Sequence, residues 1–176
     1  MENFIIAPPS KELEEKSKEL GFSKTVFLDS EFIVLEGTNK KEMLSAIQRA
    51  KWKKQVVVYQ AKEEETLRFV VEKTAVDIVL GVEQIHPKDS VHYVRSGLDQ
   101  VLCSLAAKRG VAFGFSFAQI LQSSHRPQLL ARMRANIRLC RKYNVRMVFS
   151  TFASELWELR SAADLQALWR VLEKGL

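Results

Sequence analysis

The sequence is poor in the residues that build metal sites, disulfide frameworks and nucleotide loops. It has three histidines, two cysteines and seven glycines among 176 residues. It has no H-x-H pair, no H-E-x-x-H motif, no P-loop and no G-x-G-x-x-G or G-x-S-x-G signature. These absences argue against zinc peptidases, P-loop and dinucleotide-binding enzymes and α/β-hydrolases. We interpret Ser116 and Ser150, both at predicted strand ends, as cap or turn residues rather than nucleophiles.

Long apolar runs are missing as well. No run approaches the 18 residues of a membrane span, and the N-terminal stretch lacks the basic and apolar regions of a secretory signal. Cys103 and Cys140 lie among apolar neighbours, which is typical of buried thiols. We therefore expect a cytoplasmic protein with no membrane partner, no disulfide, and neither a metal nor another cofactor.

Acidic residues are scarce in the later half of the chain. Residues 1–90 hold 14 basic and 16 acidic side chains, whereas residues 91–176 hold 13 basic and five acidic ones. The basic residues also change in type, from twelve Lys and two Arg to ten Arg and three Lys. Arginine binds phosphate through two parallel hydrogen bonds and is weakly hydrated. This asymmetry indicates a nucleic-acid partner.

Apolar runs alternate with amphipathic segments along the chain, which predicts repeated βα units in one domain over residues 1–176. Two expected strands, 25–28 and 32–35, are only three residues apart, so we expect either a hairpin or one strand with a bent excursion. Further strands are expected at residues 4–7, 56–59, 78–82, 111–115 and 147–150. Expected helices cover residues 11–20, 39–50, 63–73, 96–109, 117–122, 126–143 and 164–172.

About seven parallel strands in a chain of this size favour an α/β fold of the TIM-barrel type, with an open doubly wound sheet as the competitor. In both folds ligands bind at the carboxyl ends of the strands. Glu83, His86 and His92 follow one such strand. A small metal-dependent hydrolase of a phosphorylated substrate is therefore the alternative function.

Residues 126–146 give the clearest physical signal, because they contain seven basic side chains and no acid. On a helix, Leu130, Met133, Ile137 and Cys140 form a core stripe, while arginines recur at i, i+4 and i+7 on an adjacent face. Like charges at this spacing repel each other, and a solvated face normally interleaves Glu. An anionic partner would remove the repulsion. The other interpretations are a solvated basic face, carboxylates elsewhere in the fold, and a protein-binding scaffold whose basic face meets an acidic partner. The candidate RNA-binding residues of this segment are Arg126, Arg132, Arg134, Arg138, Arg141 and Lys142.

The preceding helix adds further candidates at its two ends. Arg95, together with His92, lies just before the predicted helix start, where backbone N–H groups favour anions. Ser96 and Asp99 resemble a capping box at this start. Lys108 and Arg109 lie at the other end, where they bind RNA or only complement the helix dipole.

Three blocks together resemble one known family. They are HYVRSGLDQVLCSLAAKRGVAFGFSF (92–117), RMRANIRLCRKYNVRMVFSTFA (132–153) and LRSAADLQAL (159–168). Their order and spacing, from about Asp77 to Leu168, are similar to those of ribonuclease P protein component 3, the 30-kDa-subunit family. The N-terminal half fits only through its order of strands and helices.

The resemblance implies a TIM-barrel-like fold without a metal site, in a non-catalytic protein subunit that binds and stabilises the catalytic RNA for 5′ maturation of precursor tRNA. It implies ribonuclease P RNA, protein component 2 (in a heterodimer or heterotetramer) and other ribonuclease P proteins as partners, with precursor tRNA contacted indirectly. It selects Arg95, Arg134, Arg138, Arg141 and Lys142 as RNA contacts.

Three positions depart from the family pattern. Ala118 stands where relatives often carry a basic residue, and Arg146 where many carry an uncharged one. Relatives usually continue past the position of Leu176 to another strand and a basic tail. We therefore expect a barrel that is incomplete or irregular.

Overall fold

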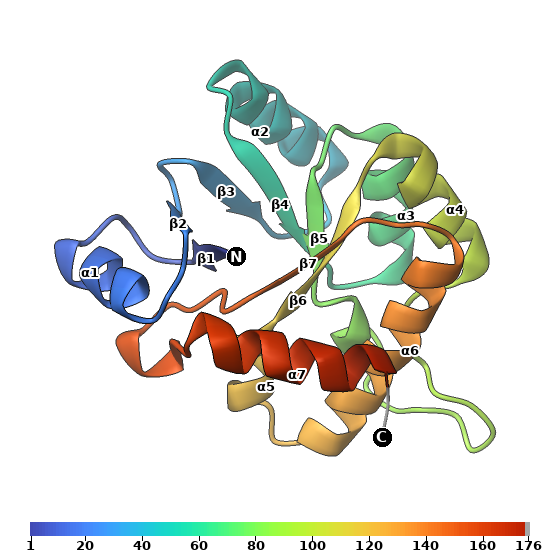
Figure 1. Ribbon diagram of the computed structural model, residues 1–176. Coiled ribbons are helices and arrows are strands. Elements are labelled where there is room, and N and C mark those ends of the chain that lie inside the picture. The colour runs from blue at the N-terminus through green and yellow to red at the C-terminus, as the bar shows by residue number, and fades with distance from the viewer. Residues whose placement is uncertain (175–176) are drawn as a thin grey trace.

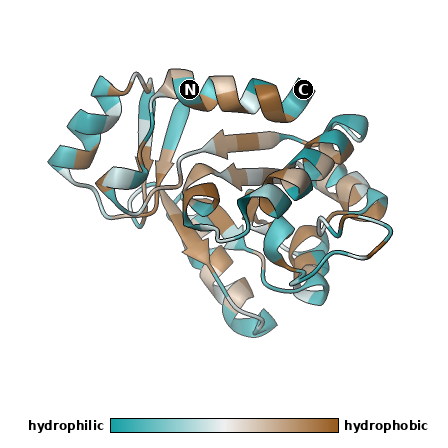
Figure 2. Ribbon diagram, turned by 90° about the horizontal axis from the view of Figure 1, so that it is seen from below, coloured by the Kyte–Doolittle hydropathy of each residue, from teal (hydrophilic) through white to brown (hydrophobic). Residues whose placement is uncertain are grey.

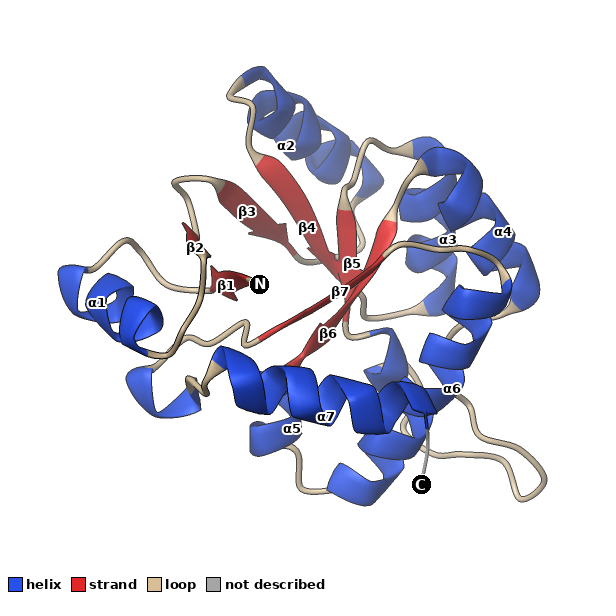
Figure 3. Ribbon diagram, in the orientation of Figure 1, coloured by secondary structure: helices blue, strands red, loops and turns tan. Residues whose placement is uncertain are grey.

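β-Branched and aromatic runs form seven strands in the computed structural model, which describes residues 1–174, and the segments between them form helices (Figures 1 and 3). The strands are β1 (Glu2–Ile5), β2 (Lys24–Phe27), β3 (Phe32–Leu35), β4 (Val56–Gln60), β5 (Ile78–Leu80), β6 (Ala112–Ser116) and β7 (Met147–Ser150). The α-helices are α1 (Lys11–Glu19), α2 (Lys40–Trp52), α3 (Glu64–Lys73), α4 (Gln100–Arg109), α5 (Phe117–Gln122), α6 (Arg126–Lys142) and α7 (Ala162–Lys174). Two short 3₁₀ helices are η1 (Val82–Gln84) and η2 (Leu156–Glu158).

The strands follow one another around a barrel in chain order. β3 to β7 form a parallel sheet of five strands, and β1 pairs in parallel with β2. Single parallel bridges join the two sheets, one between Leu28 and Phe32 and one between Ile5 and Ala153. The TIM-barrel-like prediction is confirmed. The barrel is irregular, as expected, because both junctions between its sheets are single bridges.

The hairpin alternative for the second and third strands is wrong. β2 and β3 belong to different sheets, and the bridge that joins them is parallel. Asp29 takes a left-handed conformation (φ +61°) that turns the chain sharply between them. The hairpin was predicted because strands joined by a short connection usually pair antiparallel. The sequence does not reveal that Asp29 takes a left-handed conformation and redirects the chain.

Alternate residues of each strand face the barrel interior and the helices. In β4, Val58 packs in the interior, whereas Val57 and Tyr59 pack under the surrounding helices. Gly114 faces the same interior, because a Cβ atom there would lie 2.4 Å from Leu80 Cδ2. Figure 2 shows apolar strands at the centre and hydrophilic surfaces on the helices around them. The interior cluster comprises Phe4, Val26, Phe32, Val58, Ile78, Leu80, Ala112 and Phe152.

Buried polar side chains complete the junction between β1 and β7. Asn3 Oδ1 accepts hydrogen bonds from Ser150 Oγ (3.1 Å) and Thr151 Oγ1 (2.5 Å), and its Nδ2 donates to Ser17 Oγ (3.2 Å). Ser150 Oγ in turn accepts from the backbone N of Phe4 (2.8 Å). Side chains therefore replace part of the missing backbone ladder at this seam.

The ends of α4 differ partly from the sequence prediction. The helix begins at Gln100 rather than near Ser96, and Asp99 is its N-cap, accepting from the backbone N of Leu102 at 2.7 Å. The proposed Ser96 capping box is therefore wrong, and Ser96 is instead buried. The predicted stop is confirmed, because Gly110 ends the helix in a left-handed conformation (φ +71°).

Candidate nucleic-acid interface

Helix α6 is the element on which most of the predicted basic residues lie. Pro127 occupies its first turn, where a missing N–H costs little. Leu129, Met133, Ile137 and Cys140 are buried against the rest of the molecule. The predicted core stripe is thus largely confirmed, with Leu129 more deeply buried than Leu130.

The outer face of α6 carries Arg134, Arg138, Arg141 and Lys142, which recur within one flank of the helix. Arg138 and Lys142 are exposed, and Arg134 is half-buried. Within residues 1–174, the Arg134 and Arg138 guanidiniums and the Lys142 ammonium make no hydrogen bond or ion pair, although Lys142 lies over the ring of Tyr143. These three cations are therefore available to a partner.

Two other arginines of α6 have weak contacts within the chain. Arg141 lies 3.7 Å from Glu173 Oε1 on α7 and remains 54% exposed. Arg126 is exposed at the start of the helix, but it donates to the carbonyls of Ile120 (3.1 Å) and Leu121 (2.7 Å). The Arg141–Glu173 ion pair contributes little stability because the Arg141 side chain is exposed, so Arg141 can exchange Glu173 for a phosphate.

Arg132 differs from the other candidates because it points into the molecule. It is only 4% exposed, and its Nε and one terminal nitrogen both lie 2.8 Å from Asp89 Oδ1. Its other terminal nitrogen donates to the carbonyls of Glu83 (2.9 Å) and His86 (2.6 Å). This guanidinium is not available to RNA in this conformation, so we leave Arg132 out of the proposed surface.

A line of polar residues on the inner flank of α6 holds the segment before α4. Gln128, Arg132 and Asn136 follow at intervals of four residues. Gln128 Nε2 donates to Asp89 Oδ2 (2.8 Å), and Asn136 Nδ2 donates to the Ser96 carbonyl (2.9 Å). Burial opposes the ionisation of Asp89, but hydrogen bonds from Gln128, the Arg95 backbone and Arg132 lower its pKa. Sequence reasoning missed this second polar stripe, although its regular spacing was visible.

His92 and Arg95 lie on the segment that these residues hold. Both side chains are exposed, and the backbone N of Arg95 donates to Asp89 Oδ1 (2.9 Å). The start of α4, where a phosphate was expected, already receives the Asp99 carboxylate. Lys108 is exposed at the far end of α4. Arg109 beside it donates to the Thr74 carbonyl (3.1 Å), and the structure brings neither residue onto the α6 outer face.

The residues of the alternative hydrolase site do not gather at the strand ends. Glu83 is buried, His86 contacts Glu64 Oε1 at 2.8 Å, and His92 lies on the exposed segment. Among the described residues, no group of three or more His, Cys, Asp or Glu side chains is placed to hold a metal ion. Ser116 caps α5 by accepting from the backbone N of Gln119 (3.2 Å), as predicted for a cap residue.

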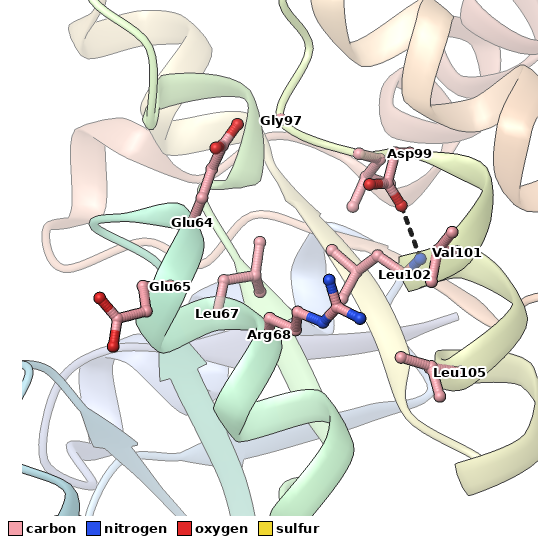
Figure 4. Close-up of a pocket in the computed structure, with 10 residues that line it drawn as sticks. Glu64, Glu65, Leu67, Arg68, Gly97, Asp99, Val101, Leu102 and Leu105 are labelled. Carbon is pink, nitrogen blue, oxygen red and sulfur yellow. Dashed lines mark hydrogen bonds between the residues drawn. The ribbon is translucent and has the colours of Figure 1, made fainter.

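A surface pocket of about 360 Å³ lies between α3 and α4 (Figure 4). Leu67, Leu102 and Leu105 line its floor and wall, and Arg68 reaches across it. Glu64, Glu65 and Asp99 stand at its rim, so its charge is opposite to that of the α6 outer face. The two surfaces therefore suit different partners.

The fold and this site define a TIM-barrel-like α/β protein with an arginine-rich helix on its outside. None of the helices within residues 1–174 is long and apolar enough to cross a bilayer. The family model described as RNase P subunit p30 matches residues 33–174. The chain belongs to this family.

Curated relatives agree with this assignment. Ribonuclease P protein component 3 of Methanosarcina acetivorans is 33% identical over 141 residues, which are 79% of this chain and 56% of the relative. The protein of the same name from Methanococcus maripaludis strain C5 is 27% identical over 144 residues, 81% of this chain and 59% of the relative. This chain thus spans little more than half the length of these relatives.

Solved structures support the fold. A chain of an archaeal ribonuclease P, solved by cryo-EM with mature tRNA, superposes with a TM-score of 0.72 at 24% identity, over 97% of this chain and 72% of that one. A Xaa-Pro dipeptidase superposes with a TM-score of 0.55 at 13% identity, over 84% of this chain and 40% of that one. These likenesses concern the barrel architecture.

Proposed function

We propose that this chain is a protein subunit of ribonuclease P that binds and stabilises the catalytic RNA for 5′ maturation of precursor tRNA. The observation that carries the proposal is the acid-free outer face of α6 in a member of the RNase P subunit p30 family. The chemistry then belongs to the RNA, and the protein contributes no catalytic residue. We place this role in the cytoplasm.

The proposed RNA surface consists of Arg134, Arg138, Arg141 and Lys142. Four cations on one flank repel one another, and phosphates placed among them convert that repulsion into attraction. Binding releases the counterions condensed on the RNA, which gives the affinity a steep dependence on salt. Phosphate contacts carry no sequence information, so the protein would recognise the shape of folded RNA.

Three other predicted basic residues lie outside this surface and would contact RNA only at its margins. Arg126 begins the same helix and would extend the surface by exchanging carbonyl contacts for a phosphate. Lys108 and Arg109 would contact RNA only if it also passed the far end of α4. We further propose that protein component 2 joins this chain in a heterodimer or heterotetramer, that other ribonuclease P proteins complete the assembly, and that precursor tRNA is contacted through it.

Replacing Arg134, Arg138 and Arg141 with Ala together tests the surface. Each lost phosphate contact lowers the slope of log K against log salt by roughly 0.7–0.9, so the triple variant should lose about two units of slope. The measurement is the affinity for ribonuclease P RNA between low and moderate salt. An unchanged slope in a folded variant would remove α6 from the RNA footprint.

A matched control removes three charges elsewhere. Lys11, Lys16 and Lys18 on α1 lie in exposed ion pairs with neighbouring glutamates, so their replacement with Ala should leave the salt slope unchanged. Cleavage of precursor tRNA, reconstituted with and without the wild-type chain, then tests the function itself. Equal cleavage in both reactions would contradict the proposal.

A further inference from the structure

The segment 86–98, here called the docking loop, exposes apolar side chains at its tip. Val91 is 96% exposed, Tyr93 64% and Val94 45%, and the loop projects from the barrel beside α6 (Figure 1). Apolar groups clustered in water are unfavourable, and on a folded protein they mark interaction sites. The proposed RNA surface does not use them.

The base of the docking loop is held firmly while its tip is free. Arg132 binds Asp89 and the His86 carbonyl at one end, and Asn136 binds the Ser96 carbonyl at the other. Gly97 (φ +86°) permits close packing there, because a Cβ atom would lie 2.1 Å from the Val82 carbonyl oxygen. A loop fixed in this way loses less conformational freedom when a partner binds it.

The tip of the docking loop is positively charged. Lys88, His92 and Arg95 are exposed around the apolar side chains. Asp89 is the only acid between positions 84 and 98, and its carboxylate is neutralised by Arg132. A partner must therefore offer apolar area together with negative charge.

The chemistry of the tip favours a protein over RNA. Tyr93 alone could stack on a base, but the aliphatic Val91 and Val94 offer an RNA no stacking surface and no hydrogen bond. Apolar side chains combined with Tyr and Arg are typical of the centre of a protein–protein interface.

We propose that the docking loop inserts Val91, Tyr93 and Val94 into an apolar pocket of a partner protein whose rim carries Asp or Glu. The loop approaches α6 on the flank of Gln128 and Arg132, about a third of a turn away from Arg134 and Arg138. Protein and RNA would thus occupy different flanks of the same helix without competing.

Photo-crosslinking tests which macromolecule the tip contacts. The experiment uses the reconstituted ribonuclease P assembly and therefore rests on the proposed function. Tyr93 is replaced by p-benzoylphenylalanine, and the irradiated assembly is analysed for adducts. We expect Tyr93 adducts with a protein subunit. Adducts with RNA, or none, would overturn the inference.

The same crosslinker at Ala131, an exposed position on the α6 outer face, reports separately on the proposed function. We expect that position to give RNA adducts. If the crosslinker at position 131 gives no RNA adduct while the one at position 93 gives a protein adduct, the RNA surface alone is contradicted. If position 131 gives an RNA adduct while position 93 gives no protein adduct, the docking loop alone is contradicted.

A binding measurement gives a second test that does not need RNA. The variant Val91→Ser, Tyr93→Ser and Val94→Ser is titrated against each ribonuclease P protein subunit by calorimetry, beside the wild-type chain. We expect at least a tenfold loss of affinity for one acidic subunit. Equal affinities of variant and wild type, or no subunit bound by the wild type, would overturn the inference.

Two controls make the loss specific. Leu44→Ser with Trp52→Ser removes exposed apolar side chains from α2 and should leave the affinity unchanged. The loop variant should also unfold at the wild-type temperature, because its three side chains are exposed at the tip. A control variant that loses as much affinity would show that the effect is not a property of the docking loop.

Discussion

Arg132 and Arg134 are chemically identical and two positions apart, yet they have opposite environments. Arg132 is buried among an acid and two carbonyls, whereas Arg134 is without a partner among the described residues. From the sequence both were predicted to bind RNA, because charge counts do not reveal which residue faces inward. Asp89, the acid that binds Arg132 in the interior, lies 43 residues earlier in the chain.

Replacing Arg132 with Ala should destabilise the protein strongly. The change removes the counter-charge of Asp89, which keeps only its neutral donors Gln128 and the Arg95 backbone, and it removes the Arg132 donor to two carbonyls. Breaking a largely buried ion pair costs about 3 kcal/mol or more. Arg138→Ala, on the outer face, should stay within about 0.5 kcal/mol of wild type. Denaturant unfolding measures both values, and equal stabilities would contradict the assignment of Arg132 as structural.

Glu83 predicts a dependence of stability on pH. Its side chain is 1% exposed, and neither carboxyl oxygen receives a hydrogen bond from a described residue. Burial raises its pKa from 4.5 to about 7, an effect that nearby Asn136 and Arg132 only partly offset. Because the folded state holds the proton more tightly than the unfolded state, stability falls as pH rises from 4.5 through 7.

Replacing Glu83 with Gln should remove this loss. At pH 8 we expect the variant to be more stable than wild type, by up to about 3 kcal/mol, and near pH 4.5 we expect no difference. Unfolding in denaturant at the two pH values provides the measurement. A constant difference between the two proteins at both pH values would rule out titration of Glu83 as the cause.

At the scale of elements, α6 was the best predicted part of the molecule. Its boundaries and its outer flank follow from periodicity, because the core stripe fixes which residues face the solvent. The docking loop was not predicted, since a loop without periodicity gives no indication of its neighbours. Its only signal was the apolar content of V-H-Y-V, at positions 91–94, among residues typical of turns.

Replacing Asn136 with Ala should loosen the docking loop. The change removes the donor to the Ser96 carbonyl, a hydrogen bond worth about 1 kcal/mol, so open forms should become roughly five to ten times more populated. Trypsin cleavage after Arg95, under mild conditions, measures the population of open forms. The control Ala135→Ser should be cut at the wild-type rate, and an unaltered rate in Asn136→Ala would show that this bond does not restrain the loop.

At the scale of the whole molecule, the order of the seven strands was predictable from repeated βα units, but the closing seam was not. Closure depends on Asn3, Ser150 and Thr151, which meet across almost the whole length of the chain. Nothing local to Asn3 distinguishes it from an exposed strand-end residue. Long-range polar contacts of this kind lie beyond periodicity and composition.

Replacing Asn3 with Ala should weaken this seam. Ser150, Thr151 and Ser17 would lose a shared partner in a buried place, which costs about 2–3 kcal/mol. The exposed neighbour Glu2, changed to Ala, should cost less than about 0.5 kcal/mol. Thermal unfolding compares the two, and a similar melting temperature for both variants would mean that backbone pairing alone closes the barrel.

Helix α6 holds the docking loop with one flank and presents its free cations on the other. Because α6 is a rigid helix that carries both binding surfaces, it fixes the angle between the partner protein and the RNA. If both proposals hold, a neighbouring subunit and the folded RNA are oriented relative to each other before either touches the other. A one-residue deletion in the middle of α6 would then misalign them by about 100°, even if each still bound on its own.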